Sequence, residues 1–112
     1  MTDNMNANHQ IIFCTCPDNG TAEKIARLLV ETSKAACVNI LPGISSFYTW
    51  NGQVESATEH LLLIKAHKEH YQAIETTIRA HHPYELPEII AVPIERGLPE
   101  YLHWIDSCHS SK

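Results

Sequence analysis

Two adjacent histidines, His81 and His82, stand directly before Pro83 and are the residues of this chain best suited to chemistry. A residue that precedes proline is pushed out of the helical region, so a predicted helix ends here and both imidazoles lie at a junction between two elements. Neutral imidazole is the commonest protein ligand for transition metals. The segment therefore offers metal-ligand chemistry, although a helix end followed by a turn and a strand explains the same residues without a metal.

Four cysteines add possible soft ligands, at Cys14, Cys16, Cys37 and Cys108. Cys14 and Cys16 are two residues apart in an apparent strand, so their side chains share a face, but this is not the spacing of a zinc ribbon. The first residues lack the charged and apolar regions of a signal peptide. We therefore expect a cytoplasmic protein with reduced thiols.

Composition excludes several classes of function. The net charge is −5 with only 8 Lys and Arg residues, and nucleic-acid binding normally requires a basic surface. No apolar stretch approaches the roughly 20 residues that span a bilayer. A phosphate-binding glycine loop, an H-E-x-x-H motif and a serine nucleophile elbow are all missing from the sequence, so we expect no enzyme. A thiol-dependent enzyme with Cys14 as nucleophile is the remaining enzymatic hypothesis.

Hydrophobic patterns predict strands and helices in a simple order. The strands are residues 10–16, 37–41, 45–50, 53–64 and 88–94, and the helices are roughly residues 20–35, 67–81 and a short one from Pro99. Residues 37–41 and 45–50 are separated by Pro42-Gly43, and we count them as one arm of a hairpin. The order is then β-α-β-β-α-β with an extra C-terminal helix. It predicts an α+β, ferredoxin-like antiparallel sheet with two helices on one face.

The hairpin between the central strands is unusually long. Asn51-Gly52 is a strong hairpin signal, because both residues tolerate positive φ. The returning strand is about twice the usual length, and only its second half is continuously apolar. A two-stranded arm of this kind is unstable alone and exposes unpaired edges, so we expect a homo-oligomer in which it pairs with a neighbouring subunit.

One domain accounts for the chain. We place it at residues 10–107, between a disordered N-terminal tail of residues 1–9 and a polar C-terminal tail of residues 108–112. Five of the eight histidines look scattered and are expected at the solvated surface: His9, His67, His70, His103 and His109.

Several sequence blocks, in the right order over roughly residues 10–106, resemble the divalent-cation tolerance proteins of the CutA family. They are Cys14-Thr15 with Pro17-Asp18, residues 34–39 (KAACVN), Leu41-Pro42-Gly43, residues 46–52 (SFYTWNG), residues 59–65 (EHLLLIK), residues 81–90 (HHPYELPEII) and Tyr101-Leu102-x-Trp104-Ile105. Gln53 departs from the pattern, because the family usually has lysine after the Trp-x-Gly turn.

The resemblance implies a cytoplasmic homotrimer that binds copper, zinc or other divalent cations and takes part in metal tolerance. The family's proposed copper ligands fall on Cys14, His81 and His82. One thiolate and two imidazoles suit copper or zinc better than magnesium or calcium. Neighbouring helical residues point about 100° apart, so both histidines can face one ion only if the backbone leaves the helix, and Pro83 favours that departure at His82.

A second group of polar residues suggests a different function. Glu59 and Lys65 are six residues apart on one predicted strand, and they could line a cleft with Tyr84 and Glu88. A structural ion pair also explains the lysine, without any ligand. The alternative hypothesis is a regulatory or scaffolding trimer, similar to the PII signalling proteins, which binds a small ligand in a cleft between subunits.

Overall fold

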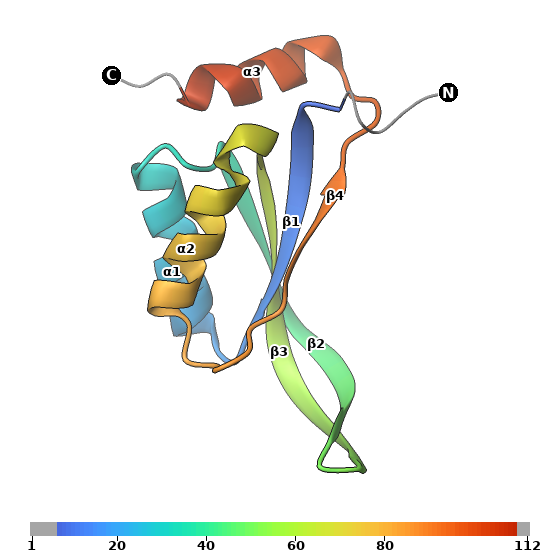
Figure 1. Cartoon of the computed structure of the whole chain (residues 1–112). Helices are drawn as coiled ribbons and strands as arrows, with labels where there is room; N and C mark the ends of the chain where they lie inside the picture. The colour runs from blue at the N-terminus through green and yellow to red at the C-terminus, as the bar shows by residue number, and fades with distance from the viewer. Residues whose placement is uncertain (1–6, 110–112) are drawn as a thin grey trace.

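A computed structural model describes residues 7–109 and shows a four-stranded antiparallel sheet with two helices on one face (Figure 1). The elements are β1 (His9–Cys16), α1 (Asn19–Glu31), β2 (Cys37–Trp50), β3 (Gln53–His67), the 3-10 turn η2 (Lys68–His70), α2 (Tyr71–His81), β4 (Ile89–Pro93) and α3 (Pro99–His109). The strands lie in the order β2-β3-β1-β4. The predicted ferredoxin-like arrangement is confirmed.

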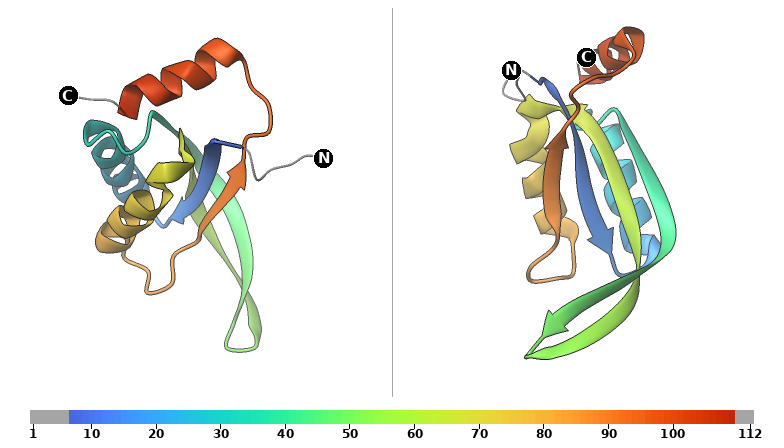
Figure 2. Two further views of the ribbon diagram at one scale, coloured as in Figure 1. Left: turned by 45° about the horizontal axis from the view of Figure 1, so that its top comes forward. Right: turned by 90° about the vertical axis from the view of Figure 1, so that its right-hand side faces the viewer.

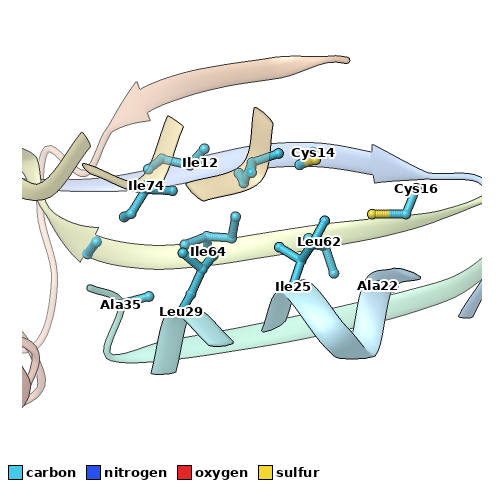
Figure 3. Close-up of a cluster of buried hydrophobic side chains, with 12 residues drawn as sticks. Ile12, Cys14, Cys16, Ala22, Ile25, Leu29, Ala35, Leu62, Ile64 and Ile74 are labelled. Atoms are coloured by element: carbon cyan, nitrogen blue, oxygen red, sulfur yellow. The ribbon is translucent and has the colours of Figure 1, made fainter. Parts of the chain in front are cut away.

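The hydrophobic core fills the space between the sheet and the helices α1 and α2 (Figure 3). Alternate residues of a strand point to one face, so Ile12, Cys14 and Cys16 of β1 all face the helices. In the antiparallel register, Ile12 lies opposite Ile64 and Cys14 opposite Leu62 on β3. Both cysteines are therefore part of the core, and each is fully buried.

Helix α1 is shorter than the predicted helix of residues 20–35. It begins after Asp18, whose side chain accepts the Thr21 N–H at 2.7 Å, and it ends at Glu31. Ser33 then adopts the left-handed conformation with φ 59°, and a right-handed helix cannot continue through such a residue. The N–H of Ala35 donates to the carbonyl of Leu29 at 3.1 Å, and Ala35 is buried in this turn rather than on a helix face.

Strand β2 continues through Pro42-Gly43, so the predicted break there is wrong. The pairing with β3 shifts register between Leu41 and Ile44, and Gly43 takes the positive φ of 71° that this irregularity requires. Proline removes a ladder hydrogen bond but is tolerated here because β2 is an edge strand.

The hairpin of β2 and β3 projects far beyond the core, as predicted (Figure 2). Asn51 and Gly52 form the turn with φ values of 52° and 75°, and Trp50 pairs with Gln53 across it. Large apolar side chains near the tip are open to solvent: Phe47 is 74%, Trp50 61% and Val54 76% exposed. An arm of this composition buries little within its own subunit.

Regular structure reaches beyond both predicted domain limits. Strand β1 begins at His9, and α3 continues through Cys108 to His109, so these two residues are helical rather than part of a polar tail. Residues 1–6 and 110–112 of the two predicted tails lie outside the described residues.

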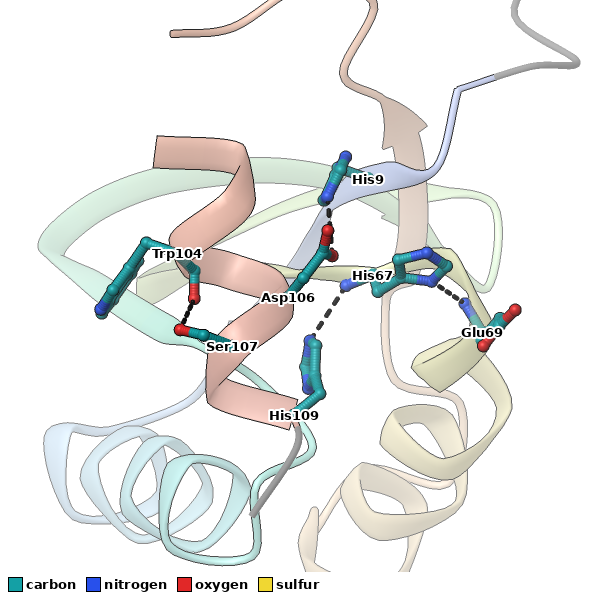
Figure 4. Close-up of polar contacts among 7 residues, drawn as sticks. All are labelled: His9, His67, Glu69, Trp104, Asp106, Ser107 and His109. Atoms are coloured by element: carbon teal, nitrogen blue, oxygen red, sulfur yellow. Dashed lines mark hydrogen bonds and ion pairs between the residues drawn. The ribbon is translucent and has the colours of Figure 1, made fainter. Parts of the chain in front are cut away.

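Four of the five histidines expected at the surface instead help to hold α3 across the end of the sheet. Figure 4 shows His9, His67 and His109 of this group. His9 Nε2 lies 2.9 Å from an oxygen of Asp106 on α3. His109 accepts the backbone N–H of His67 at 3.1 Å and donates from Nδ1 to the Ser33 carbonyl at 2.9 Å. Its ring also stacks on His70 with centroids 3.9 Å apart. Of the five, only His103 is exposed.

We predict that acid weakens the docking of α3 through His70. Burial, with His109 and His67 nearby, lowers the pKa of His70 below its usual value. The folded chain therefore binds fewer protons there than the unfolded chain, and the stabilisation present above about pH 6.5 is lost as the pH falls through the lowered pKa. The thermal midpoint should be measured at about pH 7.5 and about pH 5. Its decrease between these two pH values should be larger for wild type than for His70→Phe, because phenylalanine keeps the ring stacking but cannot be protonated.

The matched control for this experiment is His103→Phe, which replaces an exposed imidazole of α3 itself. It should show the same acid sensitivity as wild type. Equal losses in wild type and His70→Phe would contradict the prediction.

Candidate metal centre

Three buried ligand side chains meet at the end of β1. The sulfur atoms of Cys14 and Cys16 and a ring nitrogen of His82 all lie within 4.8 Å of one another. Both cysteines are 0% exposed and His82 is 8% exposed. Within residues 7–109, this is the one group of three or more histidine, cysteine or acidic side chains with metal-ligand spacing.

The ends of β1 and α2 bring these ligands together. Cys14 and Cys16 are two apart on β1 and share the face covered by the helices, where both side chains are seen in Figure 3. Helix α2 ends at His81, and His82, which precedes Pro83, has the extended values φ −95° and ψ 137°. The departure from the helix that the sequence predicts at His82 turns its imidazole toward the cysteines.

Two hydrogen bonds hold the His82 ring. Its Nδ1 accepts the backbone N–H of Tyr84 at 3.1 Å, so Nε2 carries the proton and donates to the carbonyl of Thr15 at 2.8 Å. Thr15 lies between the two cysteines, so this bond places the imidazole beside both thiols. A metal ion can take either ring nitrogen only by replacing one of these hydrogen bonds.

The two thiols differ in acidity. A hydrogen bond with Cys16 and then burial raise the pKa of Cys14 far above its usual value, with smaller contributions from the charges of Glu88 and Glu59. The same hydrogen bond lowers the pKa of Cys16, whose thiolate accepts it, although burial opposes this effect. Cys16 therefore loses its proton first and Cys14 keeps one as a donor. Because the thiolate is the form that binds metals, Cys16 is the more available ligand.

The donor set suits soft or borderline metal ions. Two sulfur atoms and one imidazole nitrogen are ligands that copper(I) and zinc(II) prefer, whereas magnesium and calcium require oxygen. The predicted copper or zinc therefore fits the residues that the fold brings together. In such a complex both cysteines act as thiolates, so binding releases protons.

The predicted ligand set of Cys14, His81 and His82 is brought together only in part. His81 is outside the group and half-buried, and it lines an adjoining open cavity of about 430 Å³ with Asp18, Lys24 and His82. Sequence reasoning missed Cys16 as a ligand. The signal was present, because alternate residues on a strand face the same way, but the spacing matches no common zinc motif.

The second predicted group also lies partly at this centre. The hydroxyl of Tyr84 donates to a carboxylate oxygen of Glu59 at 2.7 Å, and Glu59 is buried. Burial and this hydrogen bond raise the pKa of Tyr84. The negative charges of Glu59 and Glu88 also act on Cys14 and contribute to raising its pKa.

Lys65 is separate from that group. It lies six residues from Glu59 along β3, opposite Cys37 and Ile11 at the other end of the sheet. There its ammonium group donates to the side-chain oxygen of Asn39. The predicted carboxylate–lysine cluster is therefore not assembled within this chain.

These observations define a class: a ferredoxin-like subunit with a projecting hairpin and a buried thiol–imidazole group at the end of its first strand. The chain belongs to the family described as CutA1 divalent ion tolerance protein, whose model matches residues 10–108. Within residues 7–109, every helix is too short or too polar to cross a membrane.

Relatives of known sequence and structure agree with this assignment. The divalent-cation tolerance protein CutA of Pectobacterium atrosepticum is 39% identical over 96% of this chain and 97% of its own length. Protein CutA of Mus musculus is 46% identical over 83% of this chain, which spans only 52% of the mouse protein. The crystal structure of CutA from Xylella fastidiosa superposes with a TM-score of 0.90 at 48% identity, covering 93% of this chain and all of that one.

We predict that Tyr84→Phe destabilises the protein by about 1–3 kcal/mol, because it leaves the buried Glu59 carboxylate without its hydroxyl donor. The free energy of unfolding in denaturant measures this effect. The matched control is Tyr71→Phe, which removes a hydroxyl that donates to Glu75 at 3.2 Å on the same helix. That carboxylate is only half-buried, so its loss should be smaller. A larger loss in the control would show that Glu59 does not depend on Tyr84.

Proposed function

We propose that this chain is a non-enzymatic, cytoplasmic protein that binds copper or related divalent cations as a homotrimer and contributes to metal tolerance. The observation that carries the proposal is the buried group of Cys14, Cys16 and His82 in a chain of the CutA family. The P. atrosepticum relative is named a divalent-cation tolerance protein, which supports the same class of ligand.

The cation is assigned to the end of β1. Cys14 and His82 come from the predicted ligand set, and Cys16 completes the sulfur pair. The negative charges of Glu59 and Glu88 act on Cys14 and favour a cation at this position. His81 lines the cavity beside His82, so we assign it a part in the approach of the ion.

A reducing compartment agrees with the state of the cysteines. All four cysteines are free thiols. Oxidation of Cys14 and Cys16 would remove them as metal ligands. This supports the cytoplasm as the proposed location. The homologue from Archaeoglobus fulgidus, 44% identical over 91% of this chain, is described as periplasmic.

The trimer is supported by apolar surface that one subunit leaves open. Phe47, Trp50 and Val54 are exposed on the arm, and Ile90 (54%) and Val92 (41%) are exposed on the edge strand β4. A projecting β-ribbon and an unpaired edge are the two surfaces that strand pairing between subunits would cover.

The small-ligand alternative has less support. It rested on the projecting hairpin and on a carboxylate–lysine cluster. The hairpin is present, but Lys65 donates to Asn39 at the far end of the sheet, away from the carboxylates. Tyr84 and Glu59 remain as a polar pair, but they already satisfy each other. Cation binding is therefore the function that the geometry favours.

Metal titration tests the binding site. We expect anaerobic calorimetry with Cu(I), Cu(II) and Zn(II) to show binding that weakens at least about tenfold in Cys14→Ser and His82→Ala, because each removes a ligand. His81→Ala should have a smaller effect. The matched control is Cys37→Ser, which changes a partly exposed thiol at the far end of the sheet. Identical binding by all variants would show that the site is wrong.

Light scattering tests the assembly. We expect a particle of three times the 12.6 kDa chain mass in dilute solution. A double variant, Phe47→Glu with Trp50→Glu, places two charges on the exposed tip of the arm and should lower that mass. The control Val30→Glu adds a charge at an exposed apolar residue of α1 and should leave the mass unchanged. A stable wild-type particle of 12.6 kDa would refute the trimer.

A further inference from the structure

We propose that His60 is a fourth ligand of this centre, which then forms a tetrahedral site of two thiolates and two imidazoles for a thiophilic metal ion. This inference rests on the proposed cation-binding function and deepens it. The ions of that chemistry are zinc(II) and cuprous copper, both of which accept four soft or borderline ligands in a tetrahedron.

Strand register places His60 beside the sulfur pair. His60 on β3 lies directly opposite Cys16 on β1 in the antiparallel ladder. Residues opposite each other leave the same face of a sheet with their Cβ atoms roughly 4.5–5.5 Å apart. His60 therefore projects from the face that carries Cys14 and Cys16.

The His60 ring has an unused donor atom. Its Nδ1 is buried and has no hydrogen-bond partner, one of two such side-chain atoms among the described residues. A buried polar atom is normally paired, so an orphan beside two thiols requires an explanation. A metal ion supplies the missing partner. The ring must turn toward the sulfur atoms to reach it, because His60 lies outside the group whose atoms are within 4.8 Å.

Other nearby donors are already engaged. Asp18, whose pKa is lowered first by the Thr21 hydrogen bonds and to a smaller extent by His60, uses a side-chain oxygen to cap α1. Glu59 accepts the hydroxyl of Tyr84. A thiophilic ion also prefers imidazole to carboxylate. His60 is thus the neighbouring side chain with both the right chemistry and a buried free position.

Charge balance favours both cysteines together with both histidines. A divalent ion with two thiolates and two neutral imidazoles forms a complex of zero net charge, which a buried site tolerates best. When the ion binds, each thiol releases one proton, and His82 exchanges one of its two hydrogen bonds for the metal. His60 gives up no hydrogen bond at Nδ1.

Nitrogen NMR of the histidine rings tests the ligation directly. On addition of Zn(II) to the full-length protein, the Nδ1 resonance of His60 and one ring nitrogen of His82 should move to metal-bound positions. The exposed His103 should not respond and serves as an internal control. If His82 responds to zinc and His60 does not, the fourth ligand is not His60 and the inference is wrong.

Affinity measurements identify the ion. The variant His60→Val introduces a β-branched residue, which suits a strand, and should fold. Its affinity for Zn(II) or for Cu(I), depending on which ion takes four ligands, should fall at least about tenfold. The control variant His103→Ala should bind both ions as tightly as wild type. Loss for either ion supports the inference, and unchanged affinity for both overturns it. Binding that survives in His60→Val but fails in Cys14→Ser would leave the proposed function standing, and a wild-type protein that binds neither ion would refute both.

Discussion

The hydrogen bond from His82 to the carbonyl of Thr15 is the contact on which the centre depends. It joins the end of α2 to the end of β1, two elements that are 67 residues apart in the sequence. Because the carbonyl belongs to the residue between the two cysteines, the imidazole is placed beside both sulfur atoms. The N–H of Tyr84 holds the opposite side of the ring, so the orientation is fixed from two directions.

Pro83 makes this geometry possible, and the sequence alone predicts that much. A residue before proline leaves the helix, and His82 has the extended backbone that this rule requires. His81, one residue earlier, keeps the helical direction and lies in the neighbouring cavity. The sequence His81-His82-Pro83 therefore places two identical side chains in two environments. The rule for residues before proline identifies His82 as the one whose backbone leaves the helix.

The remaining parts of the centre could not be read from the sequence, because they depend on register. The pairing of β1 with β3 places His60 opposite Cys16. A register shift of one residue would place a neighbour of His60 there instead and would exchange the side chains on the two faces of the sheet. The separation of Glu59 from Lys65 has a related cause. Residues six apart on a strand share a face, yet they lie about 20 Å apart along it, so a common face does not make a common site.

The histidines of α3 show a further limit of composition. His9, His67, His70 and His109 are scattered in the sequence. The pairing of β1 with β3 brings His9 to His67, and the folding of α3 across the sheet end adds His109 to His67 and His70. His109 uses both ring nitrogens in hydrogen bonds to backbone groups, so it acts as a neutral docking group there. Imidazoles at the two ends of the sheet thus have different uses, and their hydrogen-bond partners distinguish them.

Placing the thiols inside the hydrophobic core links metal binding to stability. Cys14 and Cys16 pack among the residues that join the sheet to both helices. When protonated, they pack in the core as small apolar side chains. As thiolates they carry a charge that burial disfavours. In the proposed complex, a bound cation would remove that penalty by pairing with the charge. The site is therefore compatible with folding without an ion, and binding would add stability to the part of the molecule that the ion occupies.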